Sequence, residues 1–127
     1  MDITRKDQSF EAQFSLDEIR FIHQALNEVC HGLHVANLVT RVGDISAAKR
    51  EMQELGDIYE NAKDQQVNVP VRISLDTSRA QLYRNVLQIV CEEIEEWEFQ
   101  TRTGETRKRA MEIQAQLGEL LEEAKRA

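Results

Sequence analysis

The feature that most constrains the fold is an internal duplication, in which the chain carries one series of short segments twice. The clearest pair is FSLDEIR and ISLDTSR. Segments recur in the same order and with offsets of only 59 to 62 residues: 14–20 with 73–79, 26–30 with 87–91, 38–43 with 99–104, and 55–63 with 117–125. Self-similarity at this period indicates two copies of one supersecondary unit. We place the copies at about 8–64 and 67–126.

Each copy opens with alternating apolar and polar residues. The apolar members are Phe10, Ala12, Phe14 and Leu16 in copy one and Val67, Val69, Val71, Ile73 and Leu75 in copy two. Period two predicts a strand with one buried face. Pro70 favours an edge position, because proline cannot donate to a strand ladder. The two strands occupy equivalent places, so we expect them to pair as an antiparallel ribbon about a pseudo-twofold axis.

Two helices are predicted after each strand. Ser15 and Glu18 form a capping box at the start of the first helix of copy one. Apolar residues then recur at helical spacing: Ile19, Ile22, Leu26, Val29 and Leu33, with Tyr83, Leu87, Val90, Ile94 and Trp97 in copy two. The second helices carry similar stripes: Ala48, Met52, Leu55, Tyr59 and Ala62, and Ala110, Ile113, Leu117, Leu120 and Ala124.

The prediction is therefore a mostly helical α+β fold in one domain, residues 1–127. Two tandem strand-helix-helix repeats would be related by pseudo-twofold symmetry, with a two-stranded ribbon packed on four main helices. An all-α helical bundle is the alternative. Because edge strands need cover, we also expect a homodimer.

A Thr-Arg-x-Gly motif closes the first helical segment of each copy. The glycines, Gly43 and Gly104, suit the position after a helix end, where φ is positive. Arg41 and Arg102 suit a helix C-terminus, where a cation favours the helix dipole. The functional alternative is that the two guanidinium groups bind carboxylates or phosphates of a ligand.

With the segment LNEVCHG, 26–32, this motif resembles a unit found in small bacterial proteins without an assigned activity. The resemblance covers about half of each copy. Copy two departs from the pattern, with Gln88 at the place of Asn27 and Glu93 at the place of Gly32. No activity is implied.

The strongest candidate site is an acidic segment that copy one lacks. Its members are Glu92, Glu93, Glu95, Glu96 and Glu98, with Trp97 among them. The helical stripe favours core packing for Trp97, and an interface anchor is the alternative. The glutamates suit a solvated helix face or a docking surface for a basic partner. We predict partner binding by Glu92, Glu95, Glu96, Trp97 and Glu98.

The best metal-like grouping is Glu28, His31 and His34, because a glutamate and a histidine three residues apart share one helix face, as in di-iron bundles. Copy two has no histidine at the matching places. Surface histidines are the simpler interpretation, so no metal or other cofactor is expected.

Composition narrows the function classes. The net charge is −7, which disfavours nucleic acid and anionic membranes as partners. The two cysteines, Cys30 and Cys91, lie in apolar helical patterns typical of free thiols in a reducing compartment, so a cytoplasmic location is expected. No nucleophile–base pair or phosphate-binding loop is present, and no catalytic residue is expected. The prediction is a non-enzymatic protein-interaction module, an adaptor, regulator or inhibitor with an acidic surface. The alternative is an anion- or metal-binding protein.

Overall fold

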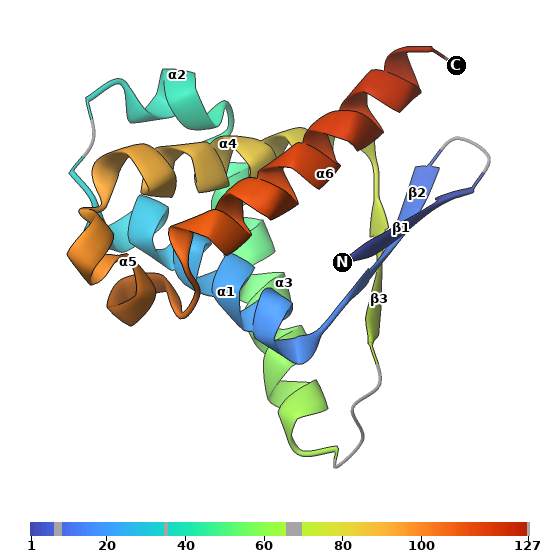
Figure 1. Ribbon diagram of the computed structural model, residues 1–127, viewed down its shortest axis with the longest axis horizontal. Helices are drawn as coiled ribbons and strands as arrows, with labels where there is room; N and C mark the ends of the chain where they lie inside the picture. Colours follow the sequence, from blue (N-terminus) through green and yellow to red (C-terminus); the bar gives the residue numbers. More distant parts are fainter. Residues whose placement is uncertain (7–8, 35, 66–69, 127) are drawn as a thin grey trace.

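A three-stranded sheet lies on one side of the molecule and most of the helical body on the other, and the C-terminal helix extends toward the sheet (Figure 1). The computed structural model describes residues 1–6, 9–34, 36–65 and 70–126. The elements of the first half are β1 (Asp2–Lys6), β2 (Ser9–Phe14), α1 (Leu16–Asn27), the π-helical turn η1 (Glu28–Gly32), α2 (Leu38–Val42) and α3 (Ile45–Lys63). Those of the second half are β3 (Val71–Leu75), α4 (Thr77–Glu93), α5 (Glu96–Thr103) and α6 (Arg107–Lys125).

The predicted mostly helical α+β class is confirmed, and the all-α alternative is wrong. The sheet has three strands rather than two, in the order β1-β2-β3, all antiparallel. β1 escaped prediction because its sequence, DITRK, contains a single apolar residue and so no alternating pattern. Pro70 immediately precedes β3, which forms an edge of the sheet as expected. Val67 and Val69 lie outside the described residues.

The two predicted strands pair directly. Phe10 lies opposite Leu75, Ala12 opposite Ile73, and Phe14 opposite Val71. Every second residue of β2 is buried, which is the period-two pattern of a strand with one inward face. Apart from β1 and η1, which have no counterpart in the described part of the second half, the elements follow the same order in both halves: strand, long helix, short helix and long helix. The twofold relation between the copies stays a prediction.

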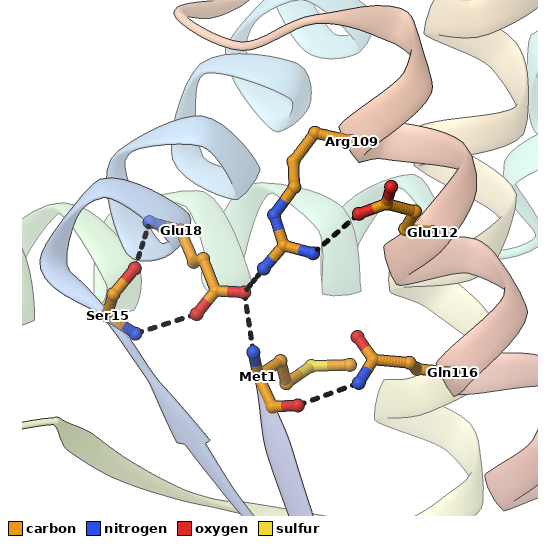
Figure 2. A network of polar contacts seen from close by, with 6 residues as sticks. All are labelled: Met1, Ser15, Glu18, Arg109, Glu112 and Gln116. Atoms are coloured by element: carbon orange, nitrogen blue, oxygen red, sulfur yellow. Dashed lines mark hydrogen bonds and ion pairs between the residues drawn. The ribbon is translucent and has the colours of Figure 1, made fainter.

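β1 covers the outer edge of β2 and is anchored at its start by buried polar contacts (Figure 2). The Met1 ammonium lies 2.8 Å from Glu18 Oε2, and Gln116 donates to the Met1 carbonyl at 2.7 Å. Arg79 donates to the Ser74 carbonyl of the opposite edge strand at 3.1 Å. These contacts hold the start of the β1 segment and one carbonyl of β3. The homodimer expected from uncovered edges stays a prediction.

The helices pack in two pairs, α1 with α3 and α4 with α6, and α1 also contacts α4. Buried apolar residues of both halves join one core, which includes Phe14, Phe21, Leu26, Tyr83 and Phe99. The predicted helix through Trp97 is wrong in one respect. The helix that begins at Thr77, α4, ends at Glu93. Ile94 adopts an extended backbone, and a separate helix, α5, starts at Glu96. Within the described part of the chain, no helix has the length and apolarity to cross a membrane.

Candidate functional site

Most of the candidate residues predicted from sequence come together at one end of the molecule, away from the sheet. η1, α2, the last turn of α4, and α5 gather there, on the left of Figure 1. η1 and α2 both contact α4. We call this region the acidic end. It brings six glutamates together with two arginines: Glu28, Glu92, Glu93, Glu95, Glu96 and Glu98, with Arg41 and Arg102.

Arg41 of α2 reaches across to the last turn of α4. Its Nη1 donates to Glu93 Oε1 at 2.7 Å, and its Nη2 donates to Glu92 Oε2 at 2.5 Å. The hydrogen bond to Glu93 raises the pKa of Arg41, and the charge of Glu92 adds to this effect. One arginine of copy one therefore compensates two carboxylates of copy two.

Arg102 of α5 makes the reverse connection, because its Nη2 donates to Glu28 Oε2 in η1. Its Nη1 also lies 3.4 Å from Glu98 Oε2, one turn earlier in α5. Gly32 leaves room for this arrangement, because a Cβ there would clash with the Glu28 carboxylate. Each copy thus donates the arginine of its Thr-Arg-x-Gly motif to glutamates of the other copy.

The glycines of the two motifs occupy the backbone conformation that the sequence predicts. Gly43 follows α2 with φ of 100°, and Gly104 follows α5 with φ of 89°. Both motifs therefore close a short helix. The carboxylates that Arg41 and Arg102 contact belong to the chain itself. Binding of an external anion at these arginines stays a prediction, and it would have to displace these intramolecular partners.

Trp97 is on the surface, so the core packing favoured by the sequence is wrong. Its side chain is 79% exposed, whereas Phe99 is 1% exposed with its ring centroid 6.5 Å from that of Phe21. A helical residue turns about 100° from its neighbour, so side chains two positions apart point to opposite sides. Once the chain breaks at Ile94 and restarts, α5 directs Phe99 inward and Trp97 outward.

Two glutamates of this segment, Glu95 and Glu96, directly precede the tryptophan. Glu95 and Glu96 are exposed, and neither forms an ion pair within the part of the chain that the structure describes. Glu95 is the N-cap residue of α5, but its side chain makes no capping hydrogen bond. Glu92, Glu93 and Glu98, in contrast, contact arginines. The acidic segment therefore divides into paired and unpaired carboxylates.

The predicted metal candidates are not assembled into a cluster. Glu28 contacts Arg102, and His31 and His34 are exposed. Across residues 1–6, 9–34, 36–65 and 70–126, no group of three or more histidine, cysteine, aspartate or glutamate side chains could hold a metal ion.

Two further features were not predicted from sequence. Val39 in α2 is 65% exposed and Met111 in α6 is 58% exposed. An open groove of about 1070 Å³ crosses the first half of α4, with Leu82 and Leu121 among its lining residues. The sequence gives no signal for this groove, because its walls come from α3, α4 and α6, which only the folded chain brings together.

At the wall of the groove, a polar network connects α3 to α4. Tyr83 donates its hydroxyl proton to Glu51 at 2.6 Å, and Arg79 Nε donates to the same carboxylate oxygen at 2.6 Å. Burial raises the pKa of Tyr83. These donors and acceptors are directed at one another, and so they link the two helices by hydrogen bonds.

No protein family, curated protein or solved structure was found to match this chain.

Proposed function

We propose that the protein is a non-enzymatic protein-interaction module, an adaptor, regulator or inhibitor, and that its acidic end is the binding surface. The observation that carries the proposal is the 79% exposure of Trp97. A large indole left in water keeps apolar area available for burial against a partner. Tryptophan is enriched among the residues that dominate binding energy at protein interfaces.

The surroundings of Trp97 support the same use. Charged neighbours keep an exposed aromatic residue soluble in the free protein and select a partner of opposite charge on binding. The acidic end carries more glutamates than arginines, so a basic partner surface is complementary. Because Arg41 and Arg102 tie α2, η1, α4 and α5 together, this surface is largely preformed.

We keep the cytoplasm as the proposed location. Cys30 and Cys91 are free thiols and half-buried, and burial raises the pKa of both. Thiols with raised pKa are weak nucleophiles, which supports packing rather than chemistry for both. Free cysteines persist where the environment is reducing.

The test is a comparative affinity capture from cell extract with three forms of the protein: wild type, Trp97→Ala and Met111→Ala. Met111 is the matched control, because it is also a large exposed apolar residue but lies on α6. Circular dichroism should show that all three forms fold equally well. We expect one or more proteins to be retained by wild type and Met111→Ala and depleted at least fivefold by Trp97→Ala.

The amount of each protein that Trp97 helps to retain should also fall as the salt concentration rises, because salt screens the charges of the acidic end. Equal capture by Trp97→Ala and wild type would reject the acidic end as the binding surface.

A further inference from the structure

The exposed glutamates beside Trp97 differ from the rest of the acidic segment in having no intramolecular cation within the described ranges. Arg41 contacts Glu92 and Glu93, and Arg102 contacts Glu98. Glu95 and Glu96 directly precede Trp97 in the sequence, and both are exposed. We call Glu95, Glu96 and Trp97 the Trp97 patch.

The position of the patch at the start of α5 leaves its side chains accessible. Glu95 has an extended backbone, with ψ of 144°, and the helix begins at the next residue. Phe99 and Thr103 anchor α5 to the core, at 1% and 0% exposure. Arg107 adds to this anchor, with its guanidinium 5.5 Å from the Phe99 ring centroid. A rigidly held helix start therefore presents two carboxylates and an indole to solvent.

We propose that the Trp97 patch binds an arginine-containing segment of the partner protein. This inference rests on the proposed function and names the chemical class of the partner. One guanidinium of the partner stacks on the indole face, and the guanidinium groups of neighbouring arginines in the same segment pair with Glu95 and Glu96. An indole is the best side-chain face for a cation, and carboxylates accept the paired N–H groups of arginine.

Arginine fits this patch better than lysine. Its guanidinium is planar, so it stacks on an aromatic ring and can form two parallel hydrogen bonds to a carboxylate. It is also more weakly hydrated than an ammonium group, so it loses less on leaving water. The intramolecular contacts of this end follow the same chemistry, because Arg41 binds two carboxylates at once.

The fluorescence of Trp97 tests the proposal directly, because it is the only tryptophan of the chain. The probes are three synthetic peptides, Arg-Gly-Arg-Gly-Arg and its Lys and Gln counterparts. Titration with the arginine peptide at low salt should change the Trp97 emission saturably. The lysine peptide should bind several-fold more weakly, and the glutamine peptide should give no saturable change.

The Glu95→Gln/Glu96→Gln variant should weaken binding of the arginine peptide by about fivefold to tenfold, as two exposed charge pairs are lost. The control is Glu119→Gln/Glu122→Gln, which makes the same change in net charge on the exposed face of α6. It should bind the peptide within about twofold of wild type.

Three results would overturn the proposal: no saturable response to the arginine peptide, equal weakening by both double variants, or equal binding of the glutamine peptide. A saturable response to Ca²⁺ that competes with the peptide would instead assign the patch to a cation. If these titrations fail while Trp97-dependent capture persists, only the partner class is wrong. If the capture fails as well, the proposed function is wrong too.

Discussion

At the scale of single residues, Glu18 shows how a buried charge is accommodated in this fold. It is 4% exposed and accepts hydrogen bonds from the Met1 ammonium, from Arg109 and from the Ser15 amide (Figure 2). Burial alone raises the pKa of its carboxyl group. The hydrogen bond from the ammonium, the Ser15 amide and the two positive charges outweigh burial, and the pKa lies below its usual value.

We expect Glu18→Gln to lower the free energy of unfolding at neutral pH by about 2 kcal/mol or more, because it leaves the buried Met1 ammonium without its counter-charge. The lowered folded-state pKa means that Glu18 stabilises the protein fully above its unfolded pKa, about 4.5. This contribution is lost as the pH falls through the folded-state value. Urea denaturation between about pH 7 and pH 3 should therefore show the wild-type advantage shrinking below about pH 4.5.

Glu112→Gln is the matched control for this carboxylate. Glu112 also pairs with Arg109, at 3.2 Å, but its side chain is 51% exposed. Exposed pairs contribute less than about 1 kcal/mol. An equal effect of the two substitutions, or a Glu18→Gln effect that does not vary with pH, would contradict this account of the network.

The contacts of Glu18 show which interactions the sequence can predict and which it cannot. The capping box is present, with Glu18 N donating to Ser15 Oγ at 3.1 Å, because both partners lie within one helical turn. Arg109 is 91 residues away, and only the folded chain brings it to Glu18. The prediction that Trp97 packs in the core is wrong for a related reason. Its outward position depends on where α4 ends, which the apolar spacing does not show.

At the scale of elements, the ion pair between Arg102 and Glu28 joins α5 to η1 and so connects the two sequence copies. We expect a double-mutant cycle with Arg102→Gln and Glu28→Gln to give a coupling energy of about 1 kcal/mol, measured by denaturant unfolding. The pair is partly buried, at 28% and 15% side-chain exposure, so it should exceed an ordinary surface pair. Additive effects of the two substitutions would show that the pair contributes nothing in solution.

Two glycines in different helical positions should respond in opposite directions to alanine. Gly104 ends α5 at φ of 89°, so Gly104→Ala should lower stability by about 1 kcal/mol. Gly118 lies inside α6, where the atoms nearest to an added Cβ belong to the flexible Arg84 guanidinium, at 3.4 Å. Alanine forms helix better than glycine by up to about 1 kcal/mol, so Gly118→Ala should raise the melting temperature. The same sign at both sites would contradict these assignments.

The elements also separate what the sequence could predict from what it could not. The long helices and the pairing of β2 with β3 follow from repeated apolar spacing, a signal present in each copy. β1 has no such spacing, and it forms because β2 offers an unpaired edge and Glu18 holds Met1. The break at Ile94 was not apparent because apolar residues at helical spacing can also run across the junction between two helices.

At the scale of the whole molecule, the two sequence copies are joined at both ends. β2 of copy one pairs with β3 of copy two at the sheet, and Arg41 and Arg102 cross between the copies at the acidic end. Buried residues of both copies belong to one cluster. Removing either copy would expose the inner face of a strand and of a helix, so each half depends on the other.

We therefore expect the chain to unfold as one cooperative unit. Hydrogen exchange measured by mass spectrometry at increasing urea resolves the two copies separately. The most protected amides of α1 and α4 should exchange with the same free energy and the same dependence on urea, because both would open only by global unfolding. Circular dichroism should give one transition at the same midpoint. Earlier opening of either copy would show that the strand pairing and the crossed arginines do not couple the halves, and would limit the rigidity available to the acidic end.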